Sequence, residues 1–187
     1  EHIGGAMHPR QFLDDFWSST LEYQVFVAMP FGGKFDSRFA DIYKPAIERI
    51  DVALDPLVNS IDRTKLSAYR VDNSRTGESI LTEIMDGIVH SYFILADISE
   101  FGRWIDENKE VYTTPNANVM YEVGLALACR QQSEVLLVRD KNDKGKLLFD
   151  ISTIPHISVD FGNLEKAKNK ITSNVLDRIK ERDWSRS

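Results

Sequence analysis

Short hydrophobic runs alternate along the chain with longer segments in which hydrophobic residues recur every three or four positions. The short runs are rich in β-branched and aromatic residues and are bounded by polar or turn-forming residues, which is typical of strands. They are "YQVFVAM" (23–29), "SAYRVD" (67–72), "SYFILADIS" (91–99), "EVLLVRD" (134–140) and "HISVD" (156–160). Residues 93–96 are apolar at every position, as expected for a parallel strand that is covered on both faces.

The longer segments predict helices that lie between these strands. They span residues 36–50, 79–90, 119–129 and 163–182. Pro45 lies inside the first helix and is expected to kink it. The alternation of strands and helices predicts an α/β fold, a flavodoxin-like (Rossmann-like) three-layer sandwich with a mainly parallel five-stranded sheet. Residues 100–114 are mostly polar and predict a long loop that acts as a lid.

Length and charge narrow the classes of partner. We expect residues 1–7, "EHIGGAM", to be left over from an expression vector, and residues 8–187 to form a single domain. The formal net charge of −6 argues against nucleic-acid and membrane partners, which require a basic face. A local basic pocket for a small molecule that carries one phosphate is compatible with this charge.

The cysteine and histidine content predicts neither a metal site nor a cofactor. The single cysteine, Cys129, lies in an apolar helical run and is expected to be a packed thiol in a reducing compartment. The four histidines lack the spacing of metal ligands. The chain shows no signal peptide and no apolar run of the roughly 18 residues that a membrane span needs, so we expect a cytoplasmic location.

The hydrophobic pattern of the helix over residues 119–129 does not explain why it carries a charged residue, Glu122. It is the only charged residue in the apolar stretch from Val119 to Cys129, and helical spacing places it on the face that should pack against the sheet. An ionised carboxylate in an apolar cleft suits attack on a sugar C1, or support of an oxocarbenium-like transition state. A buried ion pair with Arg70 or Arg75 is the alternative, and spacing alone does not choose between them.

Further candidates fall where strands end, because ligands of this fold bind outside the carboxyl ends of the strands. Asp97 ends the third strand and is a candidate for binding ribose hydroxyls or for general acid–base catalysis, with a simple capping role as the alternative. Of the two asparagines before the Glu122 helix, one is expected to cap it and the other to present its amide to a sugar or base. These asparagines are Asn116 and Asn118.

The remaining candidates would bind substrate from the first two strands. The turn after the first strand lets backbone approach a phosphate, although it lacks the GxGxxG and P-loop patterns. Arg70, Arg75 and Lys34 are candidates for binding one phosphate together, with solvated surface charges or ion-pair partners as the more common alternative. The substrate-binding set predicted from these two strands is Met29, Pro30, Phe31, Gly32, Arg70, Asp72 and Arg75.

Three motifs together resemble the nucleoside 2-deoxyribosyltransferase-like superfamily and its TIR-like relatives. They are "VFVAMPFGG" in the first strand and turn, "ADIS" at the end of the third strand, and "NANVMYEVGLALA" on the following helix. The resemblance spans roughly residues 25–140. Where the transferases carry an Asp and a Gly-Thr before the helix, this chain has residues 116–119, "NANV", which is closer to TIR-like predicted nucleotide-binding domains, some of them effectors in bacterial antiphage systems.

The resemblance implies a function as well as a fold. Relatives cleave N-glycosidic bonds of nucleosides, nucleotides or NAD, with Glu122 in the place of the catalytic glutamate and Asp97 in that of the acidic residue that positions the sugar. "MPF" would lie along the base or sugar. The implied activity is therefore that of a hydrolase or transferase, with a homo-oligomer as a further partner because several relatives build the site across a subunit interface. A non-catalytic nucleotide-binding sensor of the same fold is the alternative.

Overall fold

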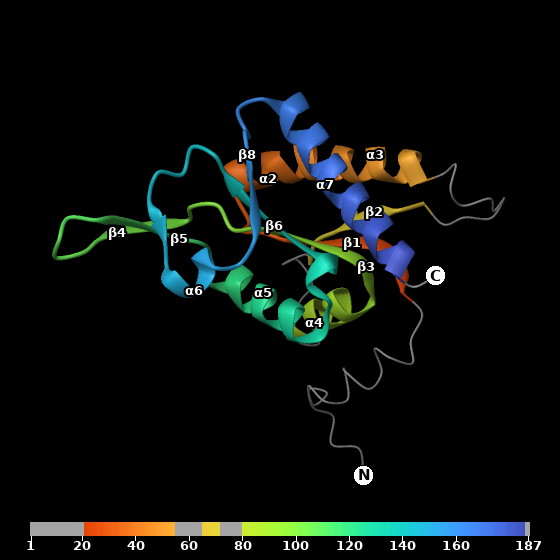
Figure 1. Cartoon of the computed structure of the whole chain (residues 1–187), viewed down its shortest axis with the longest axis horizontal. Helices are drawn as coiled ribbons and strands as arrows, with labels where there is room; N and C mark the ends of the chain where they lie inside the picture. The colour runs from red at the N-terminus through yellow and green to blue at the C-terminus, as the bar shows by residue number, and fades with distance from the viewer. Residues whose placement is uncertain (1–20, 55–64, 72–79, 186–187) are drawn as a thin grey trace, which may run out of the picture.

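The computed structural model describes residues 21–54, 65–71 and 80–185 (Figure 1). Five strands form one sheet in the order β2-β1-β3-β6-β8, and every neighbouring pair is parallel. They are β1 (Glu22–Ala28), β2 (Ser67–Tyr69), β3 (Ser91–Asp97), β6 (Val135–Asp140) and β8 (His156–Val159). This order is the flavodoxin-like one, so the predicted fold class is confirmed.

Helices cover both faces of the sheet (Figure 1). One face carries α2 (Lys34–Arg38), η1 (Phe39–Tyr43), α3 (Lys44–Leu54) and α7 (Leu164–Ser185). The other face carries α4 (Ile80–His90) and α5 (Ala117–Cys129).

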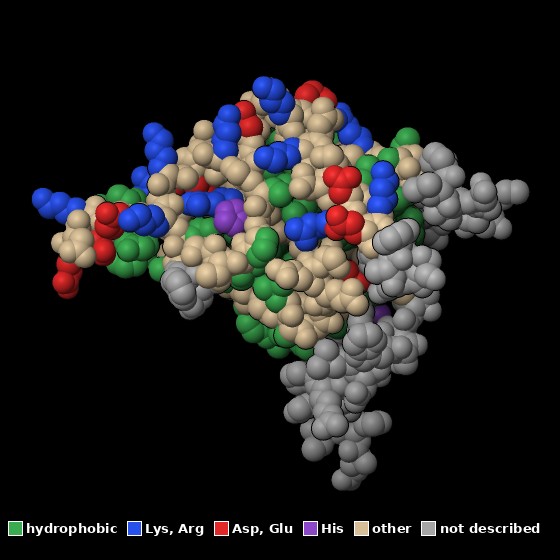
Figure 2. Space-filling model, viewed as in Figure 1, with side chains coloured by type: hydrophobic (Ala, Val, Ile, Leu, Met, Phe, Trp, Pro, Cys, Tyr) green, Lys and Arg blue, Asp and Glu red, His purple; other side chains and the backbone are tan. Residues whose placement is uncertain are grey.

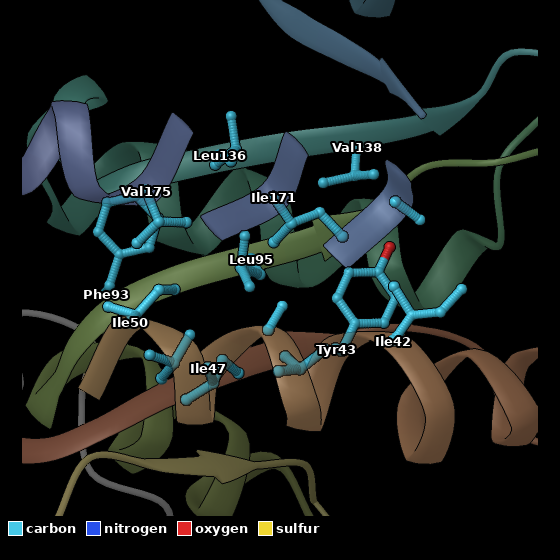
Figure 3. Packing of buried hydrophobic residues seen from close by; sticks show 14 of the residues in the cluster. Ile42, Tyr43, Ile47, Ile50, Phe93, Leu95, Leu136, Val138, Ile171 and Val175 are labelled. Atoms are coloured by element: carbon cyan, nitrogen blue, oxygen red, sulfur yellow. The ribbon is translucent and has the colours of Figure 1, made fainter. Parts of the chain in front are cut away.

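Each face has its own hydrophobic core because side chains alternate along a strand. In β3, Phe93 and Leu95 pack with α3 and α7, whereas Ile94 and Ala96 pack with α4 and α5. Figure 3 shows the first core, where Leu95 lies among side chains of the surrounding helices and of β6. The sheet therefore separates two environments that do not share side chains.

The first helical segment differs in detail from the single helix predicted over 36–50. α2, η1 and α3 follow one another from Lys34 to Leu54, and η1 is a π-helical turn that ends two residues before Pro45. Proline has no N–H to donate and its ring conflicts with the carbonyl four residues earlier. A π-helical turn widens the helix next to the proline and lets the helical segment continue.

Residues 100–114 do not form the predicted loop. They contain an antiparallel hairpin, β4 (Gly102–Ile105) and β5 (Val111–Thr114), which β7 (Lys146–Leu147) extends to a second sheet. Trp104 and Tyr112 stack across the hairpin with ring centroids 4.6 Å apart. The many charges suggested a loop, but aromatic and β-branched cross-strand pairs, Trp104 with Tyr112 and Ile105 with Val111, stabilise the hairpin.

The hairpin projects from one end of the molecule (Figure 1). Charged and hydrophobic side chains lie side by side there (Figure 2), and Trp104 and Ile105 are exposed. Two short helices, η3 (Gln132–Glu134) and α6 (Phe149–Ser152), complete the described chain. Within the described ranges, no helix has both the length and the apolar character needed to cross a membrane.

A glycine at the contact between α4 and β1 provides a test of this packing. A Cβ added at Gly87 would lie 2.6 Å from a ring carbon of Phe26 and 2.9 Å from Tyr69. We expect Gly87→Ala to lower the free energy of unfolding by about 1–3 kcal/mol, measured by urea denaturation, because both rings must move.

Gly124 is the matched control, since it lies in α5 with no heavy atom within 4 Å of an added Cβ. Gly124→Ala should stabilise the protein by roughly 0.5–1 kcal/mol through helix propensity alone. Equal effects of the two substitutions would contradict the observed contact between α4 and β1.

Candidate functional site

A cleft of about 270 Å³ opens at the carboxyl end of β1, on the face of the sheet covered by α4 and α5. The turn after β1 contributes Met29, Pro30 and Phe31. Val71, which follows β2, and the first turns of the two helices line the rest. Because this is the edge between β1 and β3 where the strand order reverses, the cleft occupies the expected ligand position of the fold.

The first turn of α5 brings its polar residues to the cleft. Asn116 is the N-cap, and its side-chain oxygen accepts hydrogen bonds from the backbone N–H groups of Asn118 at 2.9 Å and Val119 at 3.3 Å. Asn118 is exposed, lines the cleft, and uses its side chain in no hydrogen bond with a described residue. Asn116 therefore caps the helix, as was expected of one of the two asparagines, and both line the cleft; a contact of Asn118 with a sugar or base stays a prediction.

Glu122 lies one turn further along α5 and lines the same cleft. No residue in the described part of the chain forms an ion pair or hydrogen bond with its carboxyl group. Burial raises the pKa of Glu122 from 4.5 to about 7, because removal from water disfavours the charged form. At neutral pH the carboxyl group is thus poised between its protonated and ionised states.

The alternative of a buried ion pair with Arg70 is not what the structure shows. The Arg70 guanidinium pairs with Asp36 at 3.0 Å and lies 4.6 Å from the ring centroid of Phe31 and 4.5 Å from that of Phe39. Arg75 and Asp72 lie outside the described residues. Gly32 is not part of the cleft lining, and its N–H donates to Asp36.

Asp97 lies on the opposite face of the sheet from the cleft. Its side chain follows those of Phe93 and Leu95 toward the α2–α3–α7 layer, as alternation along β3 requires. It is fully buried, 3.3 Å from Arg38 and accepting a hydrogen bond from the Ser99 N–H at 3.0 Å. The structure therefore does not bring Asp97 together with Glu122, and it supports the capping alternative for this residue.

Arg38 joins Asp97 to a second carboxylate, that of Asp140 at the end of β6. The guanidinium also lies 3.8 Å from the ring centroid of Phe161. Burial first, and the neighbouring Asp97 carboxylate second, raise the pKa of Tyr43 well above its usual value. Through Arg38, this cluster connects the carboxyl ends of β3 and β6 to α2, which is a structural role.

Sequence reasoning missed several residues that line the cleft. The first turns of α4 and α5 supply apolar and aromatic side chains, and three of these are substantially exposed despite their character. These three are Ile80, Leu81 and Tyr121. Helical spacing could have identified Tyr121, three residues after Asn118, whereas the isoleucine and leucine of α4 looked like ordinary core positions.

Among the described residues, the cleft combines one desolvated carboxyl group, the exposed amide of Asn118 and apolar walls. Such a site suits a ligand with a planar or apolar part and a polar part near Glu122. Among residues 21–54, 65–71 and 80–185, no group of three or more His, Cys, Asp or Glu side chains is placed to hold a metal ion.

Comparisons with known proteins add little. No protein-family model and no curated protein matches the chain. Among solved structures, the chain is similar to the metal-soaked Flv1 flavodiiron core from Synechocystis sp. PCC6803, with 15% sequence identity and a TM-score of 0.42. The similarity covers 92% of this chain and 39% of that one. It is too distant to inform function, and the α/β fold is defined by the observed order of the strands.

The raised pKa of Glu122 predicts that the free energy of unfolding depends on pH. The unfolded chain releases this proton near pH 4.5 and the folded chain near pH 7, so the folded state binds more protons in between. Its stability therefore falls as pH rises through this window. We expect Glu122→Gln to raise the free energy of unfolding by about 2–3 kcal/mol at pH 8, and most of this gain to disappear at pH 4.5.

Urea denaturation of the native chain and the variant at both pH values measures this effect. Glu48→Gln is the matched control, because Glu48 is exposed on α3 and remote from the cleft. A Glu122→Gln effect that is the same at both pH values would show that the carboxyl group is not desolvated.

Proposed function

We propose that the chain cleaves the N-glycosidic bond of a nucleoside, nucleotide or NAD, as a hydrolase or transferase. The observation that carries the proposal is the position of Glu122, a carboxyl group in a partly apolar cleft without a described cation or hydrogen-bond partner. Proteins normally exclude such a group, because a desolvated carboxylate lowers stability. Its retention at the ligand-binding edge of the fold favours a chemical role.

In the proposed mechanism, the ionised Glu122 carboxylate acts on C1 of the sugar. The bond between C1 and the base nitrogen breaks, and its electron pair leaves with the base, which takes up a proton from water when it departs as an anion. The carboxylate forms a bond to C1 or stabilises the oxocarbenium-like charge there. Water then attacks C1, any bond between C1 and the carboxylate breaks with its electron pair returning to Glu122, and the proton lost by the water passes to the departed base or to solvent, which completes hydrolysis. Attack on C1 by a nitrogen of a second base, with the same loss of the bond to Glu122, completes transfer.

The surroundings of Glu122 support this chemistry. Apolar side chains around the carboxylate lower the local dielectric constant, which strengthens its interaction with a developing positive charge. Asn118 is placed to donate a hydrogen bond from its amide to a sugar hydroxyl or a base. Asp97 has no part in this mechanism, because it is buried on the other face of the sheet.

A nucleotide-binding sensor module, such as one used in bacterial defence signalling, is the second candidate. The position of Asp97 favours it, because Glu122 is then the only carboxylate among the described residues that line the cleft. Glycosidases that use a pair of carboxyl groups need the second group about 5–9.5 Å away.

The cytoplasmic location and the homo-oligomer expected from the sequence are retained as parts of the proposal.

Release of free base tests the proposal directly. The native chain is incubated with a panel of ribonucleosides, deoxyribonucleosides, their 5′-monophosphates and NAD, and the products are separated by chromatography. We expect base release by the native chain, and a loss of at least about a hundredfold in Glu122→Gln. If the ionised carboxylate is the reactive form, the native rate should rise as pH increases through about 7.

The control variant is Glu48→Gln, which should retain the native rate because Glu48 lies on the other face of the molecule. Equal base release by the native chain and Glu122→Gln would contradict the role given to Glu122. Ligand binding without base release from any compound would favour the sensor module.

A further inference from the structure

We infer that the β4–β5 hairpin is a dimerisation arm, on which the free edge of β4 pairs antiparallel with the same edge of a second copy of the chain. The inference rests on the homo-oligomer that is part of the proposed function and goes beyond it by naming the surface that joins the copies. It is independent of the chemistry assigned to Glu122.

The outer edge of β4 carries backbone groups that no described strand pairs. β4 is the edge strand of the second sheet, next to β5. Asp106 donates its N–H to Glu110 at 3.0 Å, one step beyond the last pair of the β4–β5 ladder. Hydrogen-bonded pairs alternate along an antiparallel ladder, so Trp104 also bonds to β5, whereas the N–H and C=O groups of Arg103 and Ile105 point outward. An open edge of this kind readily pairs with another strand.

The side chains at this edge are apolar and exposed, although the hairpin is held firmly at its base. Trp104 and Ile105 are exposed, and Figure 2 shows hydrophobic side chains at this end of the molecule. At the base of the hairpin, Asp143 accepts the Glu100 N–H at 2.7 Å. The arm projects from the rest of the molecule (Figure 1), so another chain has access to its edge. Exposed apolar side chains that are grouped in this way mark a surface for association.

A two-fold axis through Trp104 makes this edge complementary to itself. Arg103 then faces the partner's Ile105, and the two residues exchange N–H···O=C bonds because both have outward backbone groups. Trp104 lies opposite the partner's Trp104, on the same face as Tyr112, whose ring stacks on it with centroids 4.6 Å apart. The two arms thus form one continuous sheet with four aromatic rings in a row.

The charges on the hairpin fit a second copy of the same chain. Arg103 pairs with Glu100 of its own chain at 2.7 Å, whereas Glu107 and Lys109 form no ion pair with a described residue. In the two-fold pairing, the turn of one arm lies beside the base of the other. This places the partner's Glu107 beside Arg103 and the partner's Lys109 beside Glu100. Unlike charges therefore meet at both ends of the paired strands, which favours a second copy over an unrelated strand.

The backbone of Lys109 gives an independent sign that its side chain is used. Among the described residues, Lys109 is the only non-glycine residue with a positive φ, 64°. Glycine adopts this conformation at the lowest cost, so a lysine here destabilises the turn. Lys109→Gly should therefore raise the urea midpoint of the dilute chain and at the same time weaken the dimer.

Sedimentation velocity of the full chain from about 1 to 500 µM measures association. We expect a reversible monomer–dimer equilibrium with a dissociation constant in the micromolar range, because the paired arms form a small interface. Ile105→Pro removes the outward N–H, leaves the β4–β5 bonds in place, and should weaken the dimer at least about tenfold. Ile105→Thr is the matched control, because it keeps the N–H and a β-branched side chain, and it should retain most of the association.

A mixture of two charge variants tests the orientation of the arms. Arg103→Glu and Glu107→Arg each place like charges together in their own homodimers, so each should dimerise about fivefold more weakly. A heterodimer of the two variants restores both unlike pairs, so the equimolar mixture should associate more tightly than either variant alone. The difference should disappear in about 1 M salt. The mixture decides the inference by itself if Ile105→Pro does not fold.

The outcomes separate this inference from the rest of the proposal. A chain that stays monomeric at about 500 µM overturns both the inference and the proposed homo-oligomer, whether or not the β4 edge binds an extended peptide of another protein. A dimer that Ile105→Pro leaves unchanged, or a mixture that associates no more tightly than its components, overturns the inference and leaves the homo-oligomer standing. Base release is measured separately, and its absence would refute the catalysis without changing the association.

Discussion

Successive side chains of β3 point to opposite faces of the central sheet, and this alternation separates the acidic residues at its carboxyl edge into two environments. Asp97 follows Phe93 and Leu95 to one face, where Arg38 pairs with it. Ile94 and Ala96 pack on the other face, below the helix that carries Glu122. A single carboxyl group, that of Glu122, therefore remains among the described residues of the cleft. Asp97 points to the other face and neither donates a proton to it nor shares one with it.

The state of Glu122 follows from that separation. A carboxylate near a cation would be held ionised, and one in contact with a second carboxylate would share a proton. Glu122 has neither neighbour among the described residues, so burial alone raises its pKa to about 7. The fold tolerates this loss of stability at a position where a ligand has access, which is the pattern expected when function rather than packing selects a residue.

The sequence was sufficient for the sheet and for the inward-facing position of Glu122, whose catalytic role stays a prediction, and insufficient for the rest of the site. Apolar runs and helical spacing predicted the parallel sheet, the helix and an asparagine cap, because these depend on local patterns, and the structure shows that Asn116 is the asparagine that caps. The separation of Asp97 from Glu122 depends on which face of the sheet each residue of β3 points to. The packing of helices on the two faces determines this, and the sequence pattern of one strand does not reveal it. Arg70 was a candidate for binding phosphate or for an ion pair, and the structure shows an ion pair with Asp36, 34 positions away, which local patterns do not reveal. The 100–114 segment was read from its charges, whereas cross-strand pairs such as Trp104 with Tyr112 determine its structure.

A carbon-13 NMR titration of the Glu122 carboxyl carbon tests the central claim most directly. The chain is labelled with ¹³C-glutamate, and the Glu122 signal is assigned by its absence from Glu122→Gln. The account predicts a titration midpoint of about 7 in the free protein. A midpoint near the ordinary glutamate value of about 4.3 would contradict it, because Glu122 would then be solvated or paired, and the physical basis for a reactive carboxyl group in this cleft would be gone.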